Sequence, residues 1–154
     1  RGKEKYHSKF LNFYTGLSYN TRAVESSTLQ QEVRKPVINW QGGFYRHFLR
    51  MHAWGLALEA TYDGSLKEKF KESPENLDHR IVSLLPRHHF LFGRFDFSQA
   101  MGVYMYRNYP LRYQFFQRYA LHYTVFKKLQ IGGSIKAHRH VAEQMDIRAA
   151  WLFR

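Results

Sequence analysis

The stretch from His52 to Asp63 reads HAWGLALEATYD, and large apolar side chains recur in it at every second position. The two sets of alternate positions are Trp54, Leu56, Leu58, Ala60 and Tyr62 on one side, and Ala53, Gly55, Ala57, Glu59 and Thr61 on the other. Successive side chains of a β-strand point to opposite faces. This period of two therefore predicts a strand with one apolar face and one small or polar face.

The same alternation recurs along nearly the whole chain and favours an all-β fold. It is clear again in residues 9–20 and 97–107. Further segments fit strands at 36–48, 81–94, 113–126, 129–138 and 145–153. Pro86 lies within one of them and cannot donate a backbone hydrogen bond to a neighbouring strand. These segments together predict eight strands and almost no helix.

The connections between the predicted strands alternate between long and short. Long polar joins are expected at 21–35 and 64–80, and moderate ones at 108–111 and 139–144. Tight links are expected at 49–51, 94–96 and 127–128. Outer-membrane barrels have short periplasmic turns and longer outer loops. We therefore predict a closed antiparallel eight-stranded transmembrane β-barrel with up-and-down topology, a single domain over residues 1–154, and both termini on the periplasmic side.

Alternation alone does not separate a membrane barrel from a soluble barrel of the lipocalin type, whose apolar face points inward. The polar face here is rich in Gly, Ala, Ser and Tyr rather than Lys and Glu. Aromatic residues gather near the predicted strand ends, and the last strand closes on Phe153. Both features favour an apolar face that points outward into the bacterial outer membrane. Residues 1–5 have no signal-peptide pattern, so we expect the chain to start after cleavage of its signal.

The composition excludes several kinds of functional site. The chain has no cysteine, which excludes a disulfide framework, a thiolate nucleophile and a cysteine zinc site. The net charge is +12, but the basic residues are scattered and no nucleic-acid motif is present, so no nucleic-acid partner is expected. In an outer membrane the expected partners are lipopolysaccharide and other outer-membrane lipids, with other outer-membrane proteins as a further option.

Arginines near one predicted outer loop are candidates for binding lipid phosphate. Arg107 and Arg112 flank this loop, and a guanidinium matches the geometry of a phosphate group. The alternative is that these charges only keep the loops solvated.

Other charged residues are expected inside the barrel. The interior of an eight-stranded barrel is filled by side chains, so we expect Glu59 to pair with a lumen arginine, either Arg87 or Arg118. His122 shares a face with Arg118, and Lys136 is also expected to face the lumen.

The most specific stretch is GGSIKAHRHVAEQMD at residues 132–146. Together with YQFFQRYALHY at 113–123, it resembles the outer-membrane lipid A 3-O-deacylase family, in the branch labelled acyloxyacyl hydrolase. The resemblance implies a barrel that removes an ester-linked acyl chain from lipid A. In that family a histidine, a serine two residues later and an acidic residue beyond the next turn act together, since a serine needs a base to take its proton.

The resemblance assigns candidate catalytic residues. His138 matches the histidine, whereas His140 occupies the position where the serine is expected. Glu143 or Asp146 would supply the carboxylate, and Asp146 is preferred because it follows the hairpin.

Three interpretations of His138 and His140 remain open. The first is that the two histidines act together as general bases that activate water for attack on an ester. The second is that they bind a metal ion with Asp146 or Glu143, and the third is that they belong to a polar cluster in the lumen. We predict a carboxylic ester hydrolase of the lipid A deacylase type that uses no metal or other cofactor. The alternative is a non-catalytic barrel that serves as an anchor or subunit of a larger outer-membrane complex.

Overall fold

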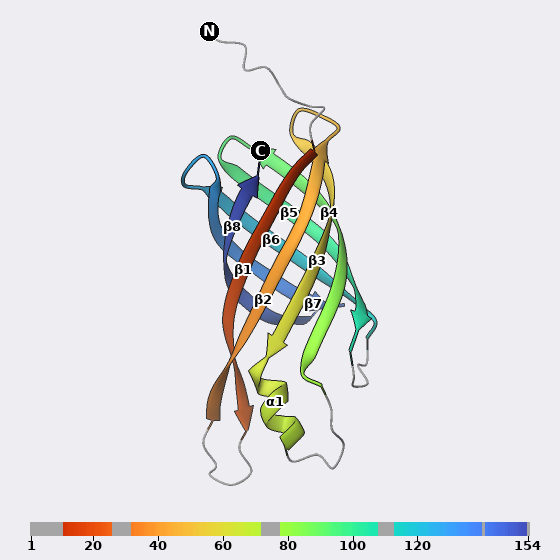
Figure 1. Cartoon of the computed structure of the whole chain (residues 1–154), viewed down its shortest axis with the longest axis vertical. Coiled ribbons are helices and arrows are strands. Elements are labelled where there is room, and N and C mark those ends of the chain that lie inside the picture. Colours follow the sequence, from red (N-terminus) through yellow and green to blue (C-terminus); the bar gives the residue numbers. More distant parts are fainter. Residues whose placement is uncertain (1–10, 26–31, 72–77, 108–112, 140, 154) are drawn as a thin grey trace.

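A computed structural model describes residues 11–25, 32–71, 78–107, 113–139 and 141–153. Their elements are β1 (Leu11–Glu25), β2 (Glu32–His47), β3 (His52–Asp63), α1 (Gly64–Lys71), β4 (Arg80–Phe92), β5 (Phe95–Tyr106), β6 (Phe115–Thr124), β7 (Leu129–His138) and β8 (Val141–Phe153). Each strand pairs antiparallel with the next, and β1 pairs with β8 to close the barrel (Figure 1). The predicted closed eight-stranded up-and-down barrel is confirmed.

The two ends of the barrel differ. The short connections at 48–51, 93–94 and 125–128 lie at the end where β1 begins and β8 finishes (Figure 1). We call this the short-turn end. The opposite end carries α1, where β1 finishes and β2 begins, and we call it the loop end (Figure 1). The predicted alternation of short and long joins is therefore found up to the last connection.

The outward and inward faces of the barrel have opposite chemistry. Large apolar side chains such as Leu58 (49% exposed) and Ile131 (48%) point outward, whereas Glu59 and Arg118 are 0% and 1% exposed. In a water-soluble barrel the apolar set would be inside. Among the described residues, no helix has the length and apolar character needed to cross a membrane.

Two connections at the loop end differ from the prediction. The connection between β1 and β2 is shorter than the predicted join at 21–35, because β1 runs to Glu25 and β2 begins at Glu32. The join expected to be loop at 64–80 begins with the helix α1. Asp63 caps this helix, since its Oδ1 atom accepts hydrogen bonds from the backbone N–H groups of Ser65 (2.9 Å) and Leu66 (3.2 Å).

The connection from β7 to β8 is also shorter than predicted, because it comprises residues 139–140 rather than 139–144. Arg139 adopts the left-handed conformation, with a φ of 55°. The strand register then shifts, since Lys136 pairs with Gln144 whereas Ala137 pairs with Ala142. Glu143 is the extra residue of this β-bulge. Bulges at barrel rims redirect a side chain, and here the redirected side chain is that of Glu143.

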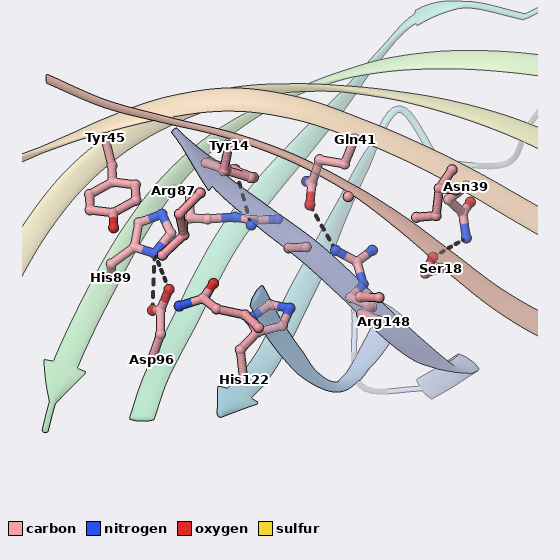
Figure 2. Close-up of a pocket in the computed structure, with 16 residues that line it drawn as sticks. Tyr14, Ser18, Asn39, Gln41, Tyr45, Arg87, His89, Asp96, His122 and Arg148 are labelled. Atoms are coloured by element: carbon pink, nitrogen blue, oxygen red, sulfur yellow. Dashed lines mark hydrogen bonds and ion pairs between the residues drawn. The ribbon is translucent and has the colours of Figure 1, made fainter. Parts of the chain in front are cut away.

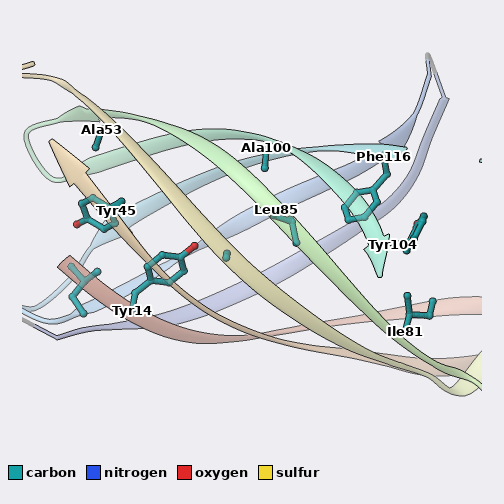
Figure 3. Packing of buried hydrophobic residues seen from close by; sticks show 10 residues of the cluster. Tyr14, Tyr45, Ala53, Ile81, Leu85, Ala100, Tyr104 and Phe116 are labelled. Atoms are coloured by element: carbon teal, nitrogen blue, oxygen red, sulfur yellow. The ribbon is translucent and has the colours of Figure 1, made fainter. Parts of the chain in front are cut away.

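Side chains fill the barrel interior in layers. Tyr14 and Tyr45 lie toward the short-turn end, and Tyr104 and Phe116 toward the loop end, with Leu85 between them (Figure 3). Gly102 makes room for the Phe116 ring, since a Cβ atom at this position would overlap it.

Candidate functional site

Four buried charged side chains form a ring inside the barrel. Arg118 bridges Glu59 (Nη2–Oε1, 2.7 Å) and Asp146 (Nη1–Oδ2, 2.8 Å). Arg148 bridges the same two carboxylates from the other side, at 3.3 Å from Glu59 and 2.9 Å from Asp146. Each guanidinium therefore binds two carboxylates, and the two positive and two negative charges balance. We call these four residues the central ring.

Of the two arginines expected as possible partners of Glu59, one binds it. Arg118 binds Glu59, but Arg87 instead donates a hydrogen bond to the hydroxyl of Tyr14 at 3.2 Å. His122 lies inside the barrel, as does Lys136. Asp146 belongs to the ring and also accepts a hydrogen bond from Ser134 at 2.6 Å.

A second cluster lies in the lumen near the loop end, around His138. His138 is the last residue of β7, and its ring points inward. Its Nδ1 atom lies 2.7 Å from Oε2 of Glu143, and its Nε2 atom lies 3.0 Å from the hydroxyl of Tyr104. The bulge in β8 brings the Glu143 carboxylate to this position. Glu143, His138 and Tyr104 thus form a chain of carboxylate, imidazole and hydroxyl.

Aromatic rings and cations surround this chain. The rings of Tyr104 and Tyr113 lie roughly parallel to the imidazole of His138, with centroids 6.0 and 5.9 Å away. The Nζ atom of Lys136 lies 4.8 Å from the centre of the Tyr104 ring and 4.0 Å from that of Phe116. A cation at these distances is attracted to the ring faces, and it would also stabilise negative charge on the Tyr104 oxygen.

The order of groups in this chain is suited to proton transfer. The Nδ1 atom of His138 lies within ion-pair distance of Glu143, although this contact does not have the geometry of a hydrogen bond. When Nδ1 carries the proton that faces this carboxylate, the Nε2 atom is an acceptor and the Tyr104 hydroxyl can donate to it. The same arrangement activates the hydroxyl nucleophile of hydrolases, because the carboxylate fixes the tautomer in which the imidazole can take a proton.

The structure changes the expected choice of carboxylate. The acidic partner of His138 is Glu143, whereas the preferred Asp146 binds Arg118 and Arg148 in the central ring. The bulge that places Glu143, and not Asp146, beside His138 leaves no mark in the alternation of a single strand.

Other predicted site residues lie nearby or outside the described chain. Arg107 donates to the backbone carbonyl of Tyr113 at 3.0 Å, and its guanidinium lies 5.5 Å from the centre of the Tyr104 ring. His140 and Arg112 lie outside the described residues. Within the described ranges, no three His, Asp or Glu side chains come together as a metal site.

Tyr104 was not predicted as a site residue. The alternation of side chains in 97–107 predicts that Tyr104 faces inward. Its place next to His138, however, depends on how strands far apart in the sequence are arranged in the barrel. A search for inward hydroxyl groups near the loop end would have included it.

Comparison with known proteins agrees with this architecture. Residues 7–154 match the family model described as acyloxyacyl hydrolase, C-terminal domain. No curated protein matches the chain at a significant level. The family match covers nearly the whole sequence, including every strand of the barrel and both lumen clusters. The chain therefore belongs to the acyloxyacyl hydrolase C-terminal domain family.

Proposed function

We propose that this protein is an outer-membrane ester hydrolase that removes an acyl chain from lipid A. The observation that carries the proposal is the chain of Glu143, His138 and Tyr104. The family membership and the outward apolar face support a place in the outer membrane. Outer-membrane barrels have short periplasmic turns and longer outer loops. We therefore orient the barrel with its short-turn end toward the periplasm and its loop end toward the lipopolysaccharide leaflet. The site near the loop end would then be on the side of its substrate.

In the proposed mechanism, Tyr104 replaces the serine that is absent from position 140. Its hydroxyl oxygen attacks the ester carbonyl while the Nε2 atom of His138 takes the proton. The imidazolium, stabilised by Glu143, returns this proton to the departing alcohol oxygen of lipid A. A water molecule then attacks the acyl–tyrosine ester, again with His138 as the base, and releases the fatty acid. The cation of Lys136 offsets negative charge on the phenol oxygen.

Arg107 is proposed to hold a lipid phosphate beside the site. Its guanidinium lies over the ring of Tyr104, and Arg107 directly follows the last residue of β5. Arg112 remains a second proposed phosphate ligand. A phosphate held here would orient the lipid, because arginine forms paired hydrogen bonds with phosphate oxygens.

The test is acyl release from purified lipopolysaccharide by the protein in detergent, followed by mass spectrometry of the lipid A. The wild-type protein should release one fatty acid per lipid. His138→Ala and Tyr104→Phe should lower kcat by at least about 10³-fold, and Glu143→Gln by about 10²-fold or more, as in other hydrolases of this design. His52→Ala, on the outer face near the short-turn end, is the matched control and should keep full activity. Loss of acyl chains that survives His138→Ala would refute the assignment.

A second function, that of a non-catalytic anchor or subunit in an outer-membrane complex, has support from two observations. His140 stands where the family's serine is expected, and His138 is only 6% exposed within the lumen. If the folded wild-type protein releases no fatty acid and forms no acyl–Tyr104 adduct, this function is favoured. Co-purification of other outer-membrane proteins with the barrel would then support it.

A further inference from the structure

Toward the short-turn end, the interior of the barrel is filled by polar side chains. Arg87, His89 and Asp96 lie around a void of about 20 Å³, which has room for one particle of the size of a water molecule (Figure 2). A larger ligand at this end therefore has to bind on the outside of the barrel.

The outer face carries a groove where β5, β6 and β7 lie side by side. Its volume is about 470 Å³, within the range of roughly 300–1,000 Å³ that is usual for small-molecule sites. Large apolar or aromatic side chains are exposed along it: Phe95, Phe97, Tyr119, Leu121, Ile131 and Ile135. The groove is therefore suited to a hydrocarbon chain.

Gly133 lines this groove on the outward face of β7, opposite Leu121 of β6 and Ile147 of β8. A Cβ atom here would meet only the backbone oxygen of Asp146, at 3.4 Å, which is an ordinary van der Waals contact. At Gly132, in contrast, a Cβ atom would overlap the backbone of Leu121. The packing of the barrel thus requires a glycine at 132 but not at 133. A glycine inside a strand is typical of a place where another molecule approaches closely.

Positive charges lie at the short-turn end of the groove. Arg94 directly precedes Phe95, the first residue of β5 and of the groove lining. Lys127 and Lys128 lie in the turn that joins β6 to β7, and all three cations are exposed. The Nη1 atom of Arg94 donates a hydrogen bond to the hydroxyl of Tyr123, another groove residue, at 3.5 Å. We call this cationic end of the groove its mouth.

The charge at the mouth decides between two occupants. The turns at 93–94 and 125–128 contain no acidic residue, and Asp96 is 3% exposed and bound by His89 inside the lumen. A second barrel in the same orientation would place its own cations at the same depth, and these like charges would repel. An anionic lipid supplies both a hydrocarbon chain for the groove and a negative charge for the mouth.

We propose that this groove binds one anionic glycerophospholipid of the periplasmic leaflet, with an acyl chain along Gly133 and its phosphate at the three cations of the mouth. In the orientation proposed above, the short-turn end faces the periplasm, and the lipids of that leaflet are glycerophospholipids. The proposal rests on this orientation but not on ester hydrolysis, because the groove lies outside the barrel and its mouth is at the opposite end from His138.

The direct test is native mass spectrometry of the wild-type barrel, released from detergent micelles that contain phosphatidylglycerol or phosphatidylcholine with the same acyl chains. We expect one phosphatidylglycerol to stay bound, and phosphatidylcholine to be retained at least about 10-fold less, because it has no net charge. Equal retention of the two lipids would overturn the proposal. A dimer that carries no lipid would also overturn it, in favour of a second copy in the groove.

Charge variants test the mouth. Lys127→Gln/Lys128→Gln should lower the retention of phosphatidylglycerol by about 10-fold or more, because each cation near a lipid surface attracts the anionic head group. The matched control is Lys67→Gln/Lys69→Gln, which removes the same charge from exposed positions of α1 at the loop end and should keep wild-type retention. Equal retention in the two double variants would contradict the assignment of the mouth.

A filled groove tests the acyl-chain site. Gly133→Leu should lower the retention of both lipids, whereas Ala23→Leu, which adds the same bulk at an exposed position of β1, should not. Unchanged lipid retention in a folded Gly133→Leu barrel would contradict the proposal, and if this variant does not fold, the lysine variants still decide. Neither substitution should change acyl release from lipopolysaccharide, so the outcome is distinguishable from that of the esterase test.

Discussion

At the scale of single residues, the protein depends on charged side chains that are removed from water. Glu59 and Arg118 are almost completely buried, and transfer of an isolated charge into such a place is strongly unfavourable. Here every member of the central ring binds two opposite charges. The ring lies inside the barrel, and the Glu143–His138–Tyr104 cluster lies toward the loop end from it.

Removal of one charge from the central ring should leave the opposite charges uncompensated. We expect Glu59→Gln to lower the free energy of unfolding by about 3–5 kcal/mol, because both Arg118 and Arg148 lose a carboxylate. The matched control is Glu68→Gln, which removes a more exposed ion pair with Lys35 and should cost less than about 1 kcal/mol. Equilibrium unfolding in urea, with the barrel in micelles, measures both. Equal losses in the two variants would show that the ring does not stabilise the fold.

At the scale of the elements, the alternation of side chains predicts the strands, but it does not predict the extension of the first hairpin or the helix α1. The bounds of β3 and β7 are those predicted from the alternation, because every second residue of a barrel strand must face outward. The first hairpin projects at the loop end, where this requirement ends, and its strands run further than the alternation indicated. The helix α1 was missed because its polar sequence resembles a loop.

The helix α1 depends on Asp63 at its start. This residue caps the helix and also binds Arg22 of β1 (Nη1–Oδ2, 3.2 Å). We expect Asp63→Ala to lower the unfolding free energy by about 1–2 kcal/mol, since both the cap and the ion pair are lost. Asp63→Ser keeps a capping oxygen and should recover most of this loss in the same urea assay. If Asp63→Ser were as unstable as Asp63→Ala, the cap would not be the source of the effect.

The candidate site was partly predictable from the sequence. His138, and Glu143 as the less favoured of two carboxylates, were predicted from the resemblance of the stretch at 132–146 to the deacylase family. The identity of the carboxylate depends on the bulge opposite Lys136, and the position of Tyr104 depends on how β5 lies relative to β7. Both are properties of strand pairing, which one sequence does not contain.

At the scale of the whole molecule, the chain is a barrel with an apolar exterior and a charged interior. This distribution is stable only if the exterior contacts hydrocarbon, because exposure of so many large apolar side chains to water would be unfavourable. The two ends then meet different surroundings, and the candidate site lies toward the end that carries α1. The proposed esterase function therefore depends on the outward face being embedded in lipid.

The most direct test of this claim uses single cysteines, which are unique labels because the chain has none of its own. Spin labels at Leu58→Cys and Leu121→Cys, on the outward face, are compared with labels at the adjacent inward positions Ala57→Cys and Ala120→Cys in lipid vesicles. We predict that oxygen, which dissolves in hydrocarbon, relaxes the two outward labels more strongly than a water-soluble nickel complex does, and that the two inward labels lack this preference. A stronger effect of the nickel complex at positions 58 and 121 would contradict the account.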